Sequence, residues 1–339
     1  MTDISALEAK EQFKDSLLEI EGVVGVGVGS GSGPVLNIYV KKMTTEIQEK
    51  LPSVANGMPT RIIEVGEIRA LPITAQMESL QSLDVSRTVK MRPCPMGVSI
   101  GNVGVSAGTA GCVVKDLATG QYGILSNAHV LVDYPPATYM DDPTVVQPGV
   151  YDGGGPNDIL GQTTRWIPLK TTAEPGAINY VDCALCLPDS QTDISPNILD
   201  LGTPAGIDTA RQGMHVIKSG RSSGVTEAEV LDVSADIRVG YGDFSCQFTD
   251  QIITTPFGIP GDSGSAVINK ANNRVCGLLF AGSDSITVVN KIHNVLGFLS
   301  LTLGGQGGSI PIGTWTTWTS AVGLLLLGGL GYTLLGGLG

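Results

Sequence analysis

The stretch Gly-Asp-Ser-Gly-Ser-Ala-Val occupies residues 261–267, and a second stretch, Ser-Asn-Ala-His-Val, lies well upstream at residues 126–130. A serine hydroxyl is a poor nucleophile at neutral pH and needs a neighbouring imidazole to accept its proton. Glycines on both sides of Ser263 allow a tight backbone turn, which can aim amide N–H groups at a developing oxyanion. The two stretches therefore indicate a nucleophile, Ser263, and a general base, His129.

Histidine is rare in this chain, so few residues compete with His129 for the role of base. The other two are His215, which is flanked by apolar residues, and His293, which comes after Ser263 in the sequence. His215 fits a packed or surface position on a strand. His293 falls in residues 292–299, which we expect to form the closing helix of the domain, so His129 stays the candidate.

The third member of such a site is an acid that fixes the tautomer of the imidazole. Asp182 lies in the mostly apolar run Ile178–Leu187, which predicts a strand. A carboxylate in such a strand is costly to bury unless a strong hydrogen-bond donor pairs with it, and an N–H of His129 would be that donor. The alternative is an Asp at a strand edge that caps a turn. Other acids between the two motifs stand mostly among Pro and Gly in loop-like sequence: Asp133, Asp141, Asp142, Asp152, Asp158 and Asp193.

Further stretches carry a resemblance to a known family. They are Val23–Gly29, Pro148–Gly154, Val216–Thr226, Val275–Gly282 and the Asp-x-Ala-Leu pattern at residues 182–185. With the His and Ser motifs, they resemble trypsin-like peptidases, in particular the group that contains bacterial members and the plant narrow-leaf-type proteins. The resemblance implies a mainly β protein with a chymotrypsin-like double β-barrel. It also implies a serine endopeptidase whose triad is His129, Asp182 and Ser263.

The same resemblance implies further site residues. The backbone amides of Gly261 and Ser263 would form the oxyanion hole, with Asp262 holding the loop in shape. The base of the primary pocket in trypsin-like enzymes lies about six residues before the nucleophile, which here is Phe257. An aromatic residue cannot recruit Lys or Arg, so we expect small or apolar residues before the scissile bond. A protein or peptide substrate is implied, with no cofactor and no metal.

Composition agrees with this fold class. The 46 glycines and 19 prolines, with few aromatic residues, suit many short strands joined by tight turns. The net charge of −12 and the lack of any basic run argue against a nucleic-acid partner, because phosphate contacts need clustered Lys and Arg. Cys183 and Cys186 form a C-x-x-C pattern, but residues three apart on a strand point to opposite faces, which predicts packing rather than metal or redox chemistry.

We predict four parts in the chain. These are an α+β module at residues 1–75, a linker at 76–95, a trypsin-like peptidase domain at 96–300, and a glycine-rich spacer with an apolar tail at 301–339. In the module, residues 1–20 predict an amphipathic helix with a capping box of Ser5 and Glu8, and residues 24–40 predict a hairpin. A prodomain, oligomerisation or partner-binding role for the module is open.

The tail is the second unusual feature. From Ile292 to Gly339 the chain contains no Lys, Arg, Asp or Glu, and Trp315 and Trp318 precede a Leu- and Gly-rich stretch. That stretch is long enough to span a hydrocarbon core of about 30 Å as a helix. We therefore expect a membrane-inserting tail, although its glycines weaken a helix; the alternative is packing in a homo-oligomer core or against the barrels. Residues 1–20 lack the features of a signal peptide, which predicts a cytoplasmic protein. The tail would associate this protein with membranes through its C-terminus.

Three functions are open at this point. The first is a serine endopeptidase that acts on specific cellular proteins. The second is a non-catalytic scaffold that keeps a peptidase fold. The third is a membrane-acting effector whose apolar tail is controlled by the peptidase domain.

Overall fold

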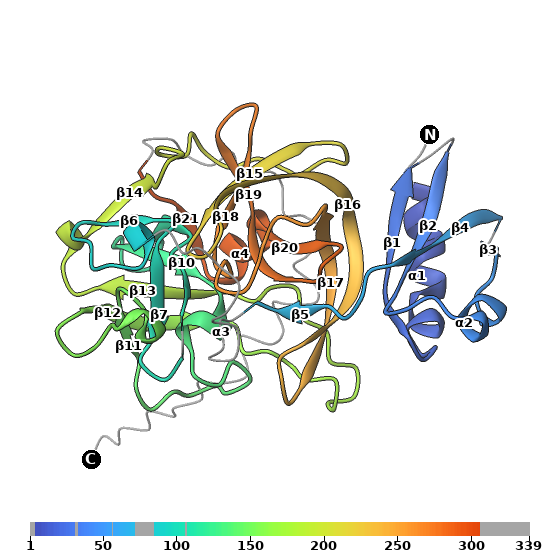
Figure 1. Ribbon diagram of the computed structural model, residues 1–339, viewed down its shortest axis with the longest axis horizontal. Coiled ribbons are helices and arrows are strands. Elements are labelled where there is room, and N and C mark those ends of the chain that lie inside the picture. The colour runs from blue at the N-terminus through green and yellow to red at the C-terminus, as the bar shows by residue number, and fades with distance from the viewer. Residues whose placement is uncertain (1–3, 31–32, 56, 72–84, 106, 306–339) are drawn as a thin grey trace, which may run out of the picture. The chain divides into compact units, whose positions relative to one another are not determined.

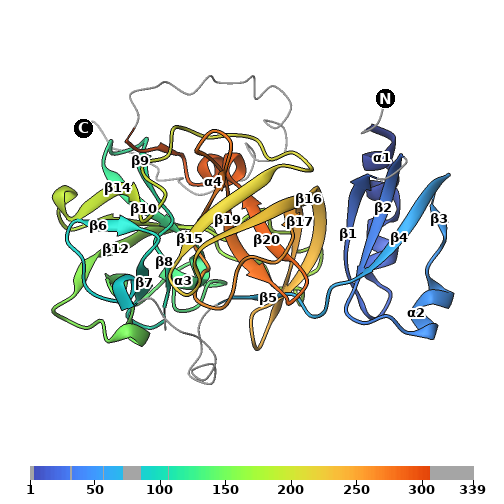
Figure 2. The same ribbon diagram turned by 45° about the horizontal axis from the view of Figure 1, so that its top comes forward.

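The structure, a computed structural model, describes residues 4–30, 33–55, 57–71, 85–105 and 107–305. The predictions for residues 306–339 and for the first part of the linker lie outside these ranges. The described chain is mainly β, with a helix at its N-terminal end (Figure 1 and Figure 2). Its strands form two large sheets and a small one. In the small sheet, β6 (Cys94–Met96) pairs with β14 (Ile194–Ile198). The mainly β fold class that the resemblance implies, and with which composition agrees, is confirmed to this extent.

The N-terminal residues form a helix packed on a hairpin. The elements are α1 (Ile4–Leu18), β1 (Val23–Ser30), β2 (Pro34–Val40), α2 (Thr45–Lys50), β3 (Val54–Ala55) and β4 (Met58–Glu64). Ala6, Ala9 and Leu17 of the predicted apolar helix face are buried in a cluster with residues of the hairpin. The predicted capping box is wrong, because Ser5 lies inside α1 and not before it.

The hairpin continues a sheet of the following domain. Gly25 of β1 pairs with Ile237 of the long strand β16 (Gly224–Gly240). Two residues further along β1, position 27 requires glycine, since a Cβ on Gly27 would lie 1.9 Å from a carboxylate oxygen of Asp232. The Tyr39 hydroxyl donates to that carboxylate at 3.0 Å. Burial raises the pKa of Asp232 to about 6, so a proton on this carboxyl helps the two parts to pack.

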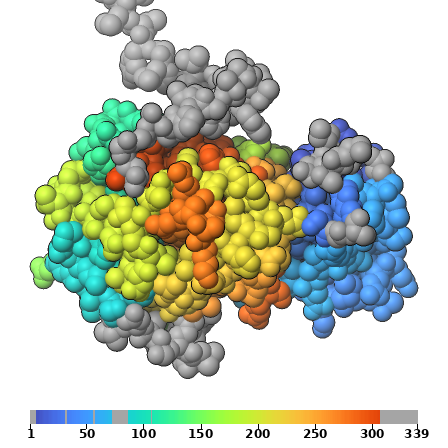
Figure 3. Space-filling view, turned by 90° about the horizontal axis from the view of Figure 1, so that it is seen from above, coloured from blue at the N-terminus to red at the C-terminus, as the bar shows by residue number. Residues whose placement is uncertain are grey.

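Six strands of the larger sheet close into a ring. Around the ring they are β15 (His215–Gly220), β16, β17 (Ser245–Thr254), β20 (Thr287–Lys291), β19 (Arg274–Gly282) and β18 (Ala266–Asn269). The ring closes because β15 pairs with both β16 and β18. In the space-filling view, yellow and orange segments of this ring cover the centre of the visible face (Figure 3). A short strand, β5 (Arg69–Ala70), pairs with β16 and β19.

The second large sheet has eight strands in an open order. Along the sheet they are β21 (Leu301–Leu303), β9 (Cys112–Asp116), β10 (Tyr122–Ser126), β13 (Ala184–Pro188), β12 (Ile159–Trp166), β11 (Thr144–Val146), β7 (Ser99–Asn102) and β8 (Gly108–Thr109). The predicted closing helix is observed as α4 (Ile292–Phe298). The folded chain continues beyond it, because β21 pairs with β9.

The cysteines are packed inside the protein. All six are buried thiols, and burial raises the pKa of Cys94, Cys112, Cys246 and Cys276 to about 12. Such thiols stay protonated and unreactive at neutral pH. Cys183 is not in a strand as predicted, because β13 begins only at Ala184. Among the described residues, no group of His, Cys, Asp and Glu could hold a metal ion, and no helix is long and apolar enough to cross a membrane.

Candidate active site

Ser263 lies in a tight turn before β18, and the two flanking glycines are required for its shape. Gly261 and Gly264 have φ angles of +93° and +94°. A Cβ on Gly261 would lie 2.1 Å from the Ser222 hydroxyl oxygen, and one on Gly264 would lie 2.1 Å from that of Ser126. Any larger residue would strain the backbone and force these neighbours apart, so the turn is built for glycine on both sides of the serine.

His129 lies in the short helix α3 (Ala128–Leu131), which follows β10. Its Nδ1 is 2.5 Å from Oδ2 of Asp182. A carboxylate that accepts from Nδ1–H selects the tautomer of a neutral imidazole in which the lone pair is on Nε2. Nε2 is buried and has no hydrogen-bond partner within the described part of the chain. The structure thus brings His129 and Asp182 together and leaves one imidazole nitrogen available as a base.

The Asp182 carboxylate is fully buried behind four donors. Oδ1 accepts from the backbone N–H groups of Ala128 at 2.7 Å and His129 at 3.3 Å. Oδ2 accepts from His129 Nδ1 and from the Tyr241 hydroxyl at 2.8 Å. The Asp182 backbone N–H donates to the side-chain oxygen of Asn290 at 2.9 Å. These donors offset the cost of burying the Asp182 charge. The prediction that Asp182 lies within a strand is wrong, because β13 begins only at Ala184.

Tyr241 supports this pair from the end of β16. Its ring stacks on Phe244 with centroids 5.3 Å apart, and it meets the His129 ring edge-on at 5.7 Å. Burial and the neighbouring Asp182 charge raise the pKa of Tyr241 well above its usual value. The hydroxyl therefore remains protonated and donates to Asp182 across the accessible pH range.

The two sequence motifs meet across β8. The Thr109 N–H donates to the Ser263 carbonyl at 2.8 Å, and the Ser126 hydroxyl donates to the Thr109 carbonyl at 2.8 Å. The Ser263 hydroxyl itself donates to the carbonyl of Phe280 on β19 at 3.3 Å. No hydrogen bond joins the Ser263 hydroxyl to His129 in the described residues.

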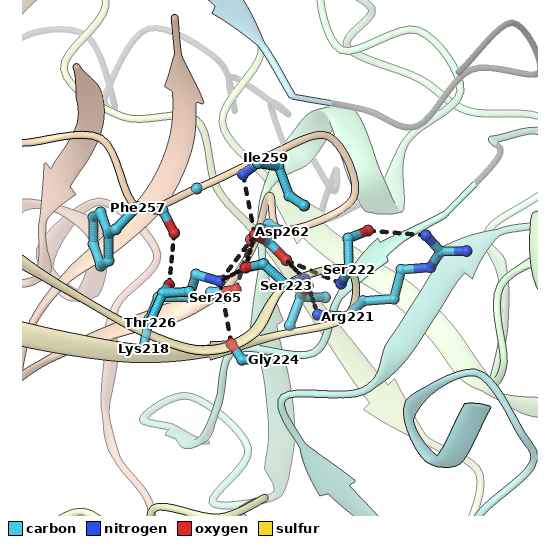
Figure 4. Close-up of polar contacts among 12 residues, drawn as sticks. Lys218, Arg221, Ser222, Ser223, Gly224, Thr226, Phe257, Ile259, Asp262 and Ser265 are labelled. Atoms are coloured by element: carbon cyan, nitrogen blue, oxygen red, sulfur yellow. Dashed lines mark hydrogen bonds and ion pairs between the residues drawn. The ribbon is translucent and has the colours of Figure 1, made fainter. Parts of the chain in front are cut away.

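Asp262, next to the serine, is held by a buried lysine (Figure 4). Lys218 Nζ lies 2.8 Å from Asp262 Oδ2, and neither side chain is exposed. Asp262 also accepts the backbone N–H groups of Ser222 at 3.0 Å, Ser223 at 3.1 Å and Ile259 at 3.1 Å. Burial lowers the pKa of Lys218, and the Asp262 charge opposes that shift. An internal ion pair thus fixes the loop that carries the serine.

The predicted oxyanion-hole residue Gly261 and the predicted pocket residue Phe257 both lie beside Leu71. The Gly261 N–H donates to the carbonyl of Leu71 at 2.8 Å. Phe257 is buried in an apolar cluster that also contains Leu71, Val216 and Leu279. Phe257 is thus part of an apolar wall close to the serine loop, and the Leu71 side chain packs into the same cluster.

A family model described as the Nal1 C-terminal domain matches residues 96–297. The chain belongs to this family. No curated protein sequence matches it. Among solved structures, it is similar to a glutamic acid-specific serine protease that uses a histidine triad in substrate binding (18% identity, TM-score 0.44, 62% of this chain and 100% of that chain). It is also similar to Nocardiopsis protease (17%, 0.44, 62% and 99%) and to Thermobifida fusca protease A (18%, 0.45, 62% and 98%). The narrow-leaf-type family predicted from the motifs is confirmed.

Sequence reasoning missed three parts of this Nal1-type site. Lys218 carried a weaker signal, because it directly follows Val216 and Ile217 in a segment that reads as a strand, where burial of a charge needs a partner. Tyr241 carried none, since a Tyr between two glycines is typical of an ordinary turn. Leu71 is one apolar residue near the predicted linker, and nothing local marks it as a neighbour of the serine loop.

Proposed function

We propose that this chain is a serine endopeptidase with a chymotrypsin-like double β-barrel, in which Ser263, His129 and Asp182 act as the triad. The observation that carries the proposal is the 2.5 Å contact between His129 Nδ1 and a fully buried Asp182 carboxylate. It fixes the tautomer that a general base needs, with the lone pair on Nε2. Ser263 supports the proposal too, because hydrogen bonds through Thr109 of β8 link its backbone to Ser126, three residues before His129.

The proposed reaction follows from these groups. The Ser263 hydroxyl leaves the Phe280 carbonyl, gives its proton to His129 Nε2, and its oxygen attacks the carbonyl carbon of the substrate. The carbonyl electrons move to the oxygen, which accepts hydrogen bonds from the Gly261 and Ser263 amides. Asp182 stabilises the imidazolium, and Nε2 returns the proton to the amine nitrogen as the C–N bond breaks.

The second half-reaction releases the acyl group. Water attacks the acyl-enzyme carbonyl while His129 takes one of its protons. The ester bond to Ser263 breaks, the serine oxygen regains the proton from Nε2, and a carboxylic acid leaves. Substrates with an apolar residue before the scissile bond are favoured, because Phe257 belongs to an apolar cluster beside the serine loop.

A non-catalytic scaffold is the second candidate, and one observation favours it. The Ser263 hydroxyl donates to Phe280 rather than to His129, so the nucleophile is not engaged with its base. The two candidates differ in one measurable property, which is whether Ser263 reacts with an electrophile that requires an activated serine.

Covalent labelling with a fluorophosphonate, read by mass spectrometry, tests the proposal. We expect one adduct, on Ser263, in the wild-type protein and in the control variant Ser195→Ala. Ser263→Ala should give no adduct and should lower peptide hydrolysis by about a million-fold, and His129→Ala by nearly as much. Full hydrolysis by a correctly folded Ser263→Ala variant would show that the nucleophile is assigned wrongly.

A further inference from the structure

A segment of the N-terminal part runs as an added strand beside the serine loop. In β5, Ala70 pairs with Ala281 and Arg69 pairs with Gly282, both antiparallel to β19. Strand β19 also carries Phe280, whose carbonyl accepts the Ser263 hydroxyl. Addition of an extended peptide to a sheet edge is a common mode of peptide binding, with main-chain hydrogen bonds for affinity and pockets for alternate side chains.

The main chain of Leu71 bonds to both sides of the nucleophile. Its carbonyl accepts from the Gly261 N–H at 2.8 Å, and its N–H donates to the Phe280 carbonyl at 3.3 Å. The Gly261 amide is one of the two donors proposed for the oxyanion, so the Leu71 carbonyl lies where a substrate carbonyl would be polarised. The Ser263 hydroxyl donates to the same Phe280 carbonyl, so Ser263 and Leu71 share one hydrogen-bond acceptor.

The Leu71 side chain occupies an apolar pocket. It is 8% exposed and belongs to the cluster of Phe257, Val216 and Leu279. The fit extends to the backbone of β19, because a Cβ added to Gly282 would lie 3.5 Å from Leu71 Cδ1. Backbone and side chain of this residue are thus both held as a bound peptide would be.

The residues before Leu71 anchor the segment. Ile68 is buried, and its carbonyl accepts from the Gly240 N–H at 3.0 Å. The Ser283 hydroxyl donates to the Val65 carbonyl. Because the segment is covalently part of the chain, it meets the pocket at a high effective concentration.

We propose that residues 69–71 are an internal ligand that fills the acyl-side substrate cleft and so excludes external peptides. The pocket that Leu71 fills would then select substrates with a leucine-like side chain before the scissile bond. This inference rests on the proposed peptidase function. The bound segment is not cleaved in this arrangement, because the Ser263 hydroxyl is turned to Phe280 and not to His129.

The variant Leu71→Asp tests the inference, because a carboxylate is unfavourable in this apolar cluster and should leave it. Fluorophosphonate labelling of Ser263 should become at least tenfold faster, because only molecules with a free cleft can bind the probe and the substitution raises their fraction. Hydrolysis of acetyl-Ile-Arg-Ala-Leu-aminomethylcoumarin, which repeats residues 68–71, should rise similarly and exceed that of the same peptide ending in Asp. Leu117→Asp is the matched control, since Leu117 is 62% exposed.

Hydrogen exchange reports the position of the segment without catalysis. Amides of residues 69–71 should be protected in the wild type and in Leu117→Asp, and exposed in Leu71→Asp. Leu71→Gly, which removes the side chain without adding charge, provides a second test should the Asp variant fail to fold.

Each outcome bears on one of the two proposals. Equal labelling rates in the wild type and a Leu71 variant whose segment is exposed would overturn the internal-ligand inference and leave the peptidase proposal standing. A wild-type fragment ending at Leu71 would also overturn it, by showing that the segment is a substrate. No labelling of a variant whose segment is exposed would overturn the peptidase proposal, and the inference with it.

Discussion

Replacing Lys218 with methionine should strongly destabilise the protein, because it leaves the Asp262 charge buried without a partner. The two side chains are fully buried, with Nζ and Oδ2 2.8 Å apart. Removing one partner of such a pair costs about 3–5 kcal/mol. Asp262 would keep donors from Ser222, Ser223 and Ile259, so we expect a loss near the lower limit, about 3 kcal/mol. That is a large share of a typical stability of about 5–15 kcal/mol.

Urea denaturation of the wild type and three variants, followed by circular dichroism, measures this loss. The matched control is Lys270→Met, because Lys270 pairs with Glu227 at 2.6 Å with both side chains 50% exposed. An exposed pair is worth less than about 1 kcal/mol. The double variant Lys218→Met/Asp262→Asn removes both buried charges and should recover part of the loss.

The result that would refute this reasoning is specific. If Lys218→Met costs no more than Lys270→Met, the buried pair does not hold the serine loop. The same follows if the double variant is no more stable than Lys218→Met. Fluorophosphonate labelling of folded Lys218→Met should also be slower than that of the wild type, because the loop that carries Ser263 loses its anchor.

Two further predictions concern the hairpin contact and the tail. Asp232 has a pKa raised from 3.8 to about 6 in the folded protein, so the folded state holds its proton where the unfolded state has lost it. Its contribution to stability therefore falls as pH rises from about 4 to about 6, and Asp232→Asn should gain up to about 3 kcal/mol relative to the wild type over that range, as read by urea denaturation at each pH. Truncation after Gly305, which keeps β21, should preserve labelling of Ser263 and abolish any sedimentation with lipid vesicles; identical sedimentation of both chains would contradict a membrane-inserting tail.

Local sequence rules singled out the candidate catalytic residues. Each was marked by a constraint that acts within a few residues: glycines around Ser263 that permit a positive φ, a single plausible imidazole in His129, and a carboxylate in an apolar run at Asp182. The same rules predicted the first helix, the hairpin and α4, because hydrophobic periodicity and turn residues are properties of short segments. They also placed a strand too early around Asp182, since periodicity cannot report the side-chain and backbone donors that hold Asp182, which lies before β13.

Contacts between distant residues decided the rest. The sequence by itself determined which candidate groups are present, because the side-chain types of Ser263, His129 and Asp182 are fixed by the chain, whereas their reactivity depends on their surroundings. Only the tertiary structure decided that Lys218 neutralises Asp262, that Tyr241 closes the cage around Asp182, and that Leu71 meets the Gly261 amide. Each of these contacts depends on how the strands of the ring pair and curve. The free energy of burying a charge or an apolar side chain is set by the residues that surround it in the folded protein, and not by its neighbours along the chain.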